Sequence, residues 1–467
     1  MKKPLRLCLC LLLSAVTALG SGCSPAGNAA EPEEPQHFSP EYDFRTDYQY
    51  SYECSSVISR PIQSDGTGQF INKNGFIFYY RPETGVMTPL CNKPNCLHDQ
   101  ETDWNRVYAC NAYASVENRC FMQYYNGYIY AIVNDANRFS DAGEQASLCR
   151  IACDGSRKDI LYTLGYGAGA WPWAIHRGYL YYCLRNYFTL GEGSQRKVCS
   201  RFTMNRVKLS SHMNAEKPEV IYDSGQHHHV YSFPRLIGYK DYILFNVVGN
   251  ELDFDMERAD VAGWYRQLYT PCYIYNTKTG ETKAIPLPDG YGAGAVLGNI
   301  ALLGDQLLVM IYDNLQPQEH LTEIYSMDLD LTESKVWMDH VPQGKYLKCY
   351  GDYLIMTDGS LRFDRVTKEN GLIGNVLKEG ESLYTNIEVF SADARLVAHC
   401  VYPKALEFPI GFGPDGVRLE TEINEEENTW SVYRLKFDDV LRCHGETLEP
   451  ELISTKPIGS LFTSWNW

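Results

Sequence analysis

The chain has 467 residues, with 58 acidic side chains against 42 Lys and Arg and a formal net charge of −16. This balance opposes binding to nucleic acid or to anionic lipid through a general electrostatic field. Long helical patterns are almost absent, and the 35 tyrosines fit a fold built from β-strands.

The first 22 residues have the three parts of a secretory signal. Basic residues precede a nearly unbroken apolar run, Leu7–Leu19, and small residues then lead to Cys23. The run is shorter than the roughly 20 residues that a membrane-spanning helix needs. A signal that ends in small residues and Cys resembles the lipobox of bacterial lipoproteins, so Cys23 is the predicted lipidation site. The alternative is ordinary cleavage and a freely secreted product.

The chain after the signal is predicted to have two parts. Residues 23–42 are rich in Pro, Ala and Glu and lack an apolar period, which predicts a flexible tether. Residues 43–467 form the predicted domain. Loss of residues 1–22 leaves 39 Lys and Arg against 58 Asp and Glu, a net charge of −19. The sequence thus predicts an exported protein, lipid-anchored to the outer face of the bacterial cell membrane.

Short aromatic and β-branched runs recur along the chain, each introduced by a turn-forming pair. The seven copies begin at Asn74, Asn126, Arg177, Lys240, Gly304, Gly351 and Asp393. A turn pair followed by such residues is typical of a tight hairpin entering its second strand. A second hairpin follows most copies, at spacings of roughly 40 to 65 residues, the period of β-propeller blades.

Repeated four-stranded units must close on themselves or leave strand edges exposed. We therefore predict an all-β fold, a single β-propeller of seven blades with four antiparallel strands each. Six and eight blades are the alternatives. Trp430–Leu441 would be the outer part of the last unit, and Asp43–Ser59 would supply a strand that latches the ring.

The most distinctive local motif is PLCNKPNCLHD (Pro89–Asp99), followed later by Cys-Asn-Ala. Together with the repeats, it resembles the propeller lipoproteins of Gram-positive gut anaerobes and, more distantly, the TolB-like propellers. Members of that family carry Cys, four residues, Cys, one residue, His, and a further Cys before Asn-Ala. The matching residues here are Cys91, Cys96, His98 and Cys110. The resemblance implies a fold and a location, and no established activity.

Three thiols and one imidazole can complete a tetrahedral zinc shell with no position left for water, which suits a structural site. Cys120 is an alternative fourth ligand. The other interpretation is disulfide pairing among Cys91, Cys96, Cys110 and Cys120, with His98 an ordinary loop residue. Either arrangement would pin a loop between the first two blades.

The links from one blade's outer strand to the next blade's inner strand are predicted to meet at the mouth of the central channel. Two of them contain the same six residues, GYGAGA, and a third contains three consecutive histidines. Imidazoles in an extended segment can chelate a metal or contact an acidic ligand, and aromatic rings can stack on sugars or peptides. The candidate ligand face comprises His227, His228, His229, Trp171, Trp173, Tyr166 and Tyr291. The simpler interpretation is a polar loop and packing between blades.

The sequence contains no nucleophile elbow, HExxH motif, P-loop or recognisable pair of catalytic carboxylates. We therefore assign no catalytic residue and predict a membrane-anchored extracytoplasmic lipoprotein whose propeller is a non-enzymatic binding or assembly module. Its predicted partner is an envelope polymer, a carbohydrate or a protein, and not nucleic acid. One alternative is a carbohydrate-active or peptide-cleaving enzyme with its site at the channel mouth. Another is a structural spacer in a lipoprotein complex.

Overall fold

The computed structural model describes a defined part of the chain. It comprises residues 38–41, 43, 46–47, 62–64, 67–73, 75–81, 83–114, 122–140, 143–166, 173–190, 197–210, 216–225, 227–228, 236–247, 271–291, 295–313, 320–358, 363–367, 373–377, 384–403, 411–413, 416–420 and 429–457. The chain divides into two units, Met1–Phe38 and Ser39–Trp467, and the second contains all of the β-structure described below. Cys23, the predicted lipidation site, lies outside the described residues. No described helix is long and apolar enough to cross a membrane.

Seven sheets of four or five strands occur in the part of the chain listed above by residue range, and the first four follow one another in chain order. The first contains β1 (Ile62–Ser64), β2 (Gln69–Lys73), β3 (Phe76–Arg81) and β4 (Val86–Pro89). The second contains β5 (Met122–Tyr125), β6 (Tyr128–Ser140), β7 (Gly143–Ala152) and β8 (Lys158–Tyr166). The third contains β9 (Trp173–His176), β10 (Tyr179–Leu190), β11 (Lys197–Lys208), β12 (Glu219–Asp223) and β13 (His227–His228). The fourth contains β14 (Leu236–Tyr239), β15 (Tyr242–Asn246), β16 (Cys272–Asn276) and β17 (Thr282–Ala284).

In the last two of the remaining three sheets, the order of strands departs from chain order. The fifth contains β18 (Ala295–Leu303), β19 (Gln306–Asp313), β20 (Leu321–Asp328) and β21 (Ser334–Pro342). The sixth contains β22 (Tyr346–Tyr350), β23 (Tyr353–Thr357), β26 (Tyr384–Ser391), β27 (Leu396–Pro403) and β31 (His444–Thr447). The seventh contains β28 (Gly411–Gly413), β29 (Gly416–Glu420), β30 (Thr429–Leu435) and β32 (Glu451–Pro457). A separate hairpin consists of β24 (Phe363–Thr367) and β25 (Ile373–Leu377), and the short helices are η1 (His98–Gln100), α2 (Trp104–Ala109) and α4 (Phe437–Arg442).

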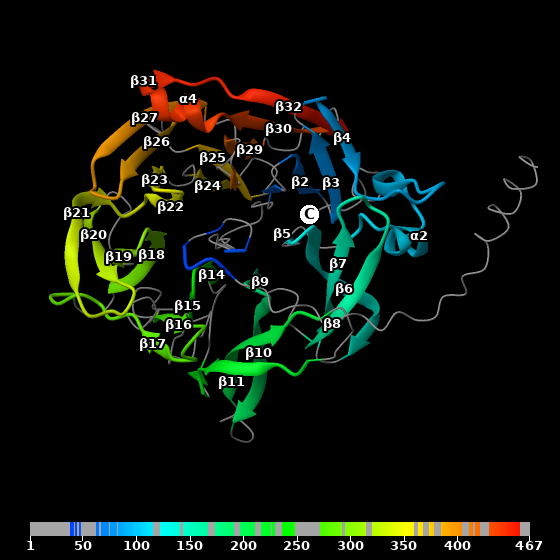
Figure 1. Cartoon of the computed structure of the whole chain (residues 1–467), viewed down its shortest axis with the longest axis horizontal. Helices are drawn as coiled ribbons and strands as arrows, with labels where there is room; N and C mark the ends of the chain where they lie inside the picture. Colours follow the sequence, from blue (N-terminus) through cyan, green and yellow to red (C-terminus); the bar gives the residue numbers. More distant parts are fainter. Residues whose placement is uncertain are drawn as a thin grey trace, which may run out of the picture. The chain divides into compact units, whose positions relative to one another are not determined.

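The sheets stand around a central axis in Figure 1, each with its first strand innermost. Strand β1 contacts β5 of the second sheet and β28 of the seventh, which closes the ring. The predicted all-β propeller of antiparallel, mostly four-stranded units is confirmed. Because the first and last sheets meet, the chain of sheets has no open edge at either end.

Two-residue turns join the first two strands in several sheets. Asn126 and Gly127 have φ angles of 46° and 79°, and Arg177 and Gly178 have 45° and 78°. Two positive φ angles in succession characterise the type I′ turn, whose twist matches that of the flanking strands. The turn pairs recognised in the sequence therefore form the turns of the innermost hairpins in these sheets.

Apolar side chains fill the spaces between neighbouring sheets. One cluster spans the second to fourth sheets and includes Leu148, Tyr181 and Phe245, none of them more than 1% exposed. Burial of each such side chain stabilises the fold by about 1.5–3 kcal/mol. Side chains that alternate along each strand thus hold adjacent sheets together face to face.

The last unit differs from the prediction. The predicted outer part, Trp430–Leu441, is divided between β30, the third of the four strands, and helix α4. Strand β32, paired antiparallel with β30, takes the outer position. Most of the predicted latch, Asp43–Ser59, lies outside the described residues. Its described start is a turn, in which the amide of Asp47 donates to the carbonyl of Asp43 at 2.7 Å.

Candidate metal centre

A compact loop between β4 and β5 carries the Cys/His motif. Cys91 follows β4, and the chain then turns through Asn95 and His98, whose φ angles are 61° and 53°. The Asp103 side chain caps the N-terminus of α2, which is the usual role of Asp at that position. Cys110 follows α2 directly, and its amide donates to two carbonyls of the last helical turn at 3.0 Å. Backbone geometry thus presents the ligands from both ends of the loop.

The four predicted ligand residues lie together. The donor atoms of Cys91, Cys96, His98 and Cys110 are all within 4.8 Å of one another. His98 Nδ1 is 3.6 Å from Cys110 Sγ. A tetrahedral zinc ion with Zn–S near 2.3 Å and Zn–N near 2.0 Å would hold sulfur and nitrogen about 3.5 Å apart, close to the observed separation. The cluster therefore fits a metal such as zinc, with Nδ1 as the imidazole ligand.

The cysteines of the cluster are thiols in the structure, and none of Cys91, Cys96 and Cys110 is in a disulfide bond. Cys120, the alternative ligand, lies outside the described residues. A Cys₃His set fills all four tetrahedral positions with protein atoms, so a metal bound here would have no site for a reacting water. The arrangement is that of a structural centre.

The thiols of the cluster differ in proton affinity. Burial alone would raise the pKa of Cys91, but hydrogen bonds from the backbone at Lys93 and Asn111, and from the other thiols, lower it below its usual value. Burial and the charges of Cys91 and Cys96 raise the pKa of Cys110 well above its usual value. Crowding three thiolates is unfavourable without a cation, so a bound metal would both gather them and keep them deprotonated.

Lys158 on β8 supports the loop from the neighbouring sheet. Its ammonium donates to the carbonyls of Tyr108, Cys110 and Tyr113 at 3.1, 2.8 and 2.8 Å. Burial lowers the pKa of this ammonium below its usual value. A zinc ion with three thiolates and a neutral imidazole carries a net charge of −1, and the Lys158 charge would offset it. Ordered groups of this kind around a metal orient its ligands.

Gly155 in the β7–β8 turn brings the second sheet against the loop. It has φ of +73°, and a Cβ there would lie 2.8 Å from the Cys91 nitrogen. Its carbonyl accepts from the Asn92 amide at 3.2 Å and from Asn111 Nδ2 at 2.9 Å. The loop is therefore fastened between the first two sheets, as the sequence predicts. Neither Lys158 nor Gly155 was identified from the sequence, because both are distant from the motif along the chain.

The candidate ligand face is only partly within the described residues. His227 and His228 form β13, which pairs with β11, whereas Trp171, His229 and the side chains of His227, His228 and Tyr166 lie outside them. Trp173 is 4% exposed and belongs to the core between sheets. Tyr291 donates to Glu323 Oε2 at 2.8 Å. The two described side chains thus have packing and hydrogen-bonding roles.

A buried ion-pair network joins the N-terminal segment to the ring. Arg177 donates to both carboxylate oxygens of Asp47, at 2.7 and 3.1 Å, and to Asp241 at 2.8 Å. It also donates to the carbonyls of Ser39 at 2.7 Å and Glu41 at 3.4 Å. The Asp47 side chain is 0% exposed and that of Arg177 is 7% exposed. Bidentate contacts of this kind fix geometry as well as charge.

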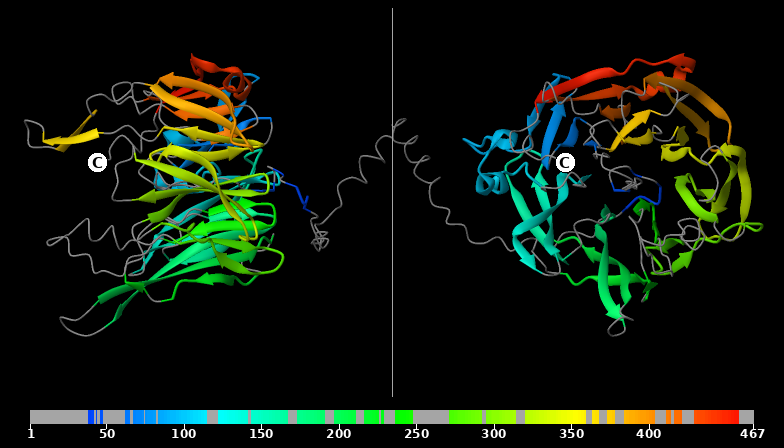
Figure 2. Two further views of the ribbon diagram at one scale, coloured as in Figure 1. Left: turned by 90° about the vertical axis from the view of Figure 1, so that its left-hand side faces the viewer. Right: turned by 180° about the vertical axis from the view of Figure 1, so that it is seen from behind.

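The N-terminal segment therefore lies on the face that carries the turns between first and second strands. Lys240 in the next such turn extends the network, with Nζ 2.8 Å from Asp305 and 3.4 Å from Glu41. Figure 2 shows the described part of this segment, in dark blue, at one face of the ring and the β24–β25 hairpin at the other. The links that lead into β9 and the other innermost strands start on the face of the ring opposite these turns.

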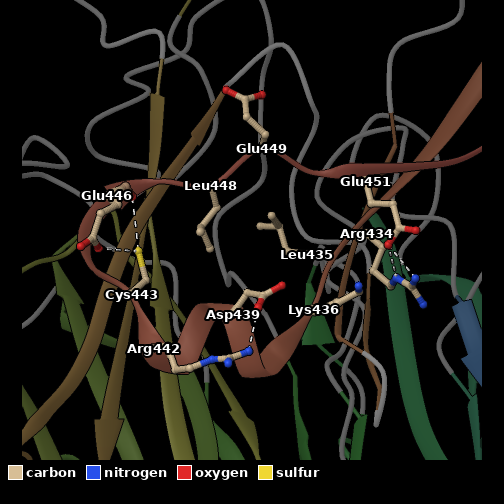
Figure 3. A pocket seen from close by; sticks show the side chains of 10 residues that line it. All are labelled: Arg434, Leu435, Lys436, Asp439, Arg442, Cys443, Glu446, Leu448, Glu449 and Glu451. Carbon is tan, nitrogen blue, oxygen red and sulfur yellow. Dashed lines mark hydrogen bonds and ion pairs between the residues drawn. The ribbon is translucent and has the colours of Figure 1, made fainter.

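A cavity of about 530 Å³ lies beside α4 (Figure 3). Its lining comprises Arg434, Leu435, Lys436, Asp439, Arg442, Cys443, Glu446, Leu448, Glu449 and Glu451. Two of its cations are paired, Arg434 with Glu451 at 2.6 Å and Arg442 with Asp439 at 2.9 Å. This polar cavity is separate from the Cys/His cluster in the chain and in the ring.

Comparisons with known proteins found similarity only among solved structures. Neither a protein-family model nor a curated protein sequence matches the chain. Among solved structures, it is similar to an oligogalacturonate lyase in complex with manganese, with 14% identity, a TM-score of 0.44, and coverage of 83% of this chain and 89% of the other. An oligogalacturonate lyase from Vibrio parahaemolyticus has 13% identity, a TM-score of 0.40, and coverages of 82% and 89%. Dipeptidyl peptidase 4 from Porphyromonas gingivalis has 13% identity, a TM-score of 0.38, and coverages of 87% and 54%.

Proposed function

We propose that this chain is an extracytoplasmic lipoprotein, anchored through a lipid on Cys23, whose propeller is a non-enzymatic binding or assembly module stiffened by structural zinc. Its partner is an envelope polymer, a carbohydrate or another protein. The propeller supplies a rigid ring with loops on two faces, and such loops are where binding residues concentrate on rigid scaffolds.

The Cys₃His cluster carries the zinc part of this proposal. Four protein donors within 4.8 Å of one another, with Cys110 Sγ and His98 Nδ1 3.6 Å apart, would leave no coordination position for substrate on a tetrahedral metal. Zinc would tie the loop to the first two sheets and contribute to folding free energy. The metal would then have a structural role, which fits a module that binds a partner through its surface.

The N-terminal network supports the anchoring part. Arg177 holds the carbonyls of Ser39 and Glu41, so a tether that starts at Cys23 would reach the ring at the face of the inner turns. The sixteen residue-to-residue steps from Cys23 to Ser39 span at most about 55 Å when fully extended. The opposite face, which carries the links into the innermost strands, would then be available to a partner outside the cell.

Two experiments test the proposal. The full chain and Cys23→Ser, expressed in a Gram-positive host, should fractionate with membranes and with the medium, respectively. Equal release of both proteins would contradict lipid anchoring. The mature chain should bind a subset of a glycan, wall-polymer and peptide array reversibly, without altering the bound compound. Turnover of an array compound by the purified protein would contradict a non-enzymatic role.

A further inference from the structure

The chain between β30 and β32 forms a loop that leaves the seventh sheet and returns to it. At the base of the loop, Arg434 on β30 lies opposite Glu451 on β32 and pairs with it at 2.6 Å. At its far end, β31 pairs in parallel with β27 of the sixth sheet, and the Leu448 amide donates to the Val401 carbonyl at 2.8 Å. We call residues 435–450 the bridging loop. Its base and its far end are therefore fixed to two different sheets.

The cavity of about 530 Å³ beside α4 lies within the bridging loop. Every residue that lines it belongs to this loop or to the ion pair at its base. The volume is within the range of about 300–1,000 Å³ that small-molecule sites have. Leu435, which is 3% exposed, and Leu448 supply the apolar part of the lining, and Figure 3 shows their side chains between Glu449 and α4. Because the loop is fixed to two sheets, the cavity is part of the fold.

Seven of the ten lining residues are charged. Five of them already have a partner on the protein: Arg434, Asp439, Arg442, Glu446 and Glu451. Within the part of the chain that the structure describes, the side chains of Lys436 and Glu449 have neither an ion-pair partner nor a hydrogen-bond partner. Both are exposed to solvent, so a ligand can reach them. The cavity thus offers one positive and one negative charge to a ligand.

A short peptide with free ends matches this lining. Its ammonium can bind the Glu449 carboxylate and its terminal carboxylate can bind the Lys436 ammonium. An apolar side chain of the peptide can lie against Leu435 and Leu448. Three cations and four carboxylates line the cavity, a balance that opposes polyanions such as nucleotides. An uncharged sugar would leave both charges without a partner.

We propose that the cavity in the bridging loop is a binding site for short peptides with free termini. Glu449 binds the ammonium of the peptide, Lys436 binds its carboxylate, and the two leucines contact an apolar side chain. The peptide is bound and released unchanged. The proposal is independent of the lipid anchor and of the zinc centre.

The dipeptide alanyl-leucine is the probe for this site. Saturation-transfer NMR with the purified chain and millimolar peptide should show transfer to the leucine methyl protons. N-acetyl-alanyl-leucine lacks the ammonium, and alanyl-leucine amide lacks the carboxylate. Each should bind about fivefold more weakly than alanyl-leucine, the effect expected from the loss of one exposed ion pair. Equal affinities for the three peptides, or no transfer to alanyl-leucine, would overturn the proposal.

Variants assign each end of the peptide to its partner. Glu449→Gln should bind alanyl-leucine as weakly as the parent binds the acetylated peptide, and acetylation should then have no further effect. Lys436→Gln should show the same relation with the amide. Lys335→Gln and Glu83→Gln replace exposed charges elsewhere in the ring and should keep the affinities of the parent. A loss on acetylation that persists in Glu449→Gln would overturn the assignment of the peptide to this cavity.

Discussion

Arg177 and Asp47 form a bidentate ion pair across 130 positions of sequence, with contacts of 2.7 and 3.1 Å. The pair joins the N-terminal segment to an innermost turn, and Asp241 shares the same guanidinium at 2.8 Å. A buried charge that loses its partner is strongly unfavourable. The segment before the first sheet is therefore part of the folded ring at Asp47.

Arg177→Met should lower the free energy of unfolding by about 3–5 kcal/mol, because it leaves Asp47 buried without its partner. Urea titration followed by circular dichroism measures this change. Arg395→Met is the matched control: its contact with Asp393 joins side chains that are 76% and 67% exposed, and an exposed pair contributes about 0–1 kcal/mol. Equal effects of the two substitutions would show that the network is not a stabilising contact.

His176 should make stability fall below neutral pH. Burial lowers its pKa to about 3, and the usual value is about 6.5. As the pH falls below 6.5, the unfolded chain binds a proton that the folded chain does not. The free energy of unfolding therefore decreases by about 2 kcal/mol between pH 7 and pH 5. His176→Gln should flatten this part of the curve, measured by urea unfolding at each pH.

His340→Gln is the control for that pH curve, because its side chain is 77% exposed and is similarly solvated in folded and unfolded chains. It should leave the slope between pH 7 and pH 5 as in the parent. The difference between slopes is the relevant quantity, since the His176 ring also meets the Lys240 carbonyl at 2.6 Å and its loss changes absolute stability. Identical slopes for the parent and His176→Gln would contradict the burial of a neutral imidazole.

Gly155→Ala should destabilise the protein and weaken its metal affinity. The new Cβ would meet the Cys91 backbone at 2.8 and 2.9 Å, in addition to the strain of a φ of +73°. Gly225→Ala isolates the strain, because Gly225 has φ of +72° and nothing within 4 Å of a Cβ. The backbone strain alone should lower the free energy of unfolding by about 1–2 kcal/mol. Zinc competition with a chromophoric chelator should show a loss at Gly155 only, and unchanged zinc affinity of both variants would refute the contact.

Lys158→Met should lower zinc affinity by about 10–100-fold, as is usual when a supporting group around a metal is removed. It leaves the carbonyls of Tyr108, Cys110 and Tyr113 without their shared donor. Lys335→Met on β21 removes an exposed ammonium and should leave zinc affinity unchanged. The same chelator competition measures the zinc affinity of both variants. Parent-like affinity in Lys158→Met would show that Lys158 stabilises the fold without affecting the metal site.

Local patterns predicted most of the fold and the metal cluster. Pairs such as Arg177-Gly178 signal type I′ turns because few residues adopt two positive φ angles, and ligand spacing marks Cys91, Cys96 and His98 because the chain between them is short. Partners brought by other sheets leave no local signal. Gly155 and Lys158 reach the centre from the second sheet, and Asp47 reaches Arg177 from far upstream. Phe437–Arg442 forms α4 within a strand-like run, because the chain must cross there to pair with β27.

The most direct test of the central claim is the metal content of the chain, measured by native mass spectrometry and elemental analysis after purification without chelators. We predict one zinc ion per chain, lost in Cys91→Ser and in Cys110→Ser and retained in Cys349→Ala. A metal-free parent chain in which Cys91, Cys96, Cys110 and Cys120 are joined by disulfide bonds would contradict the zinc centre.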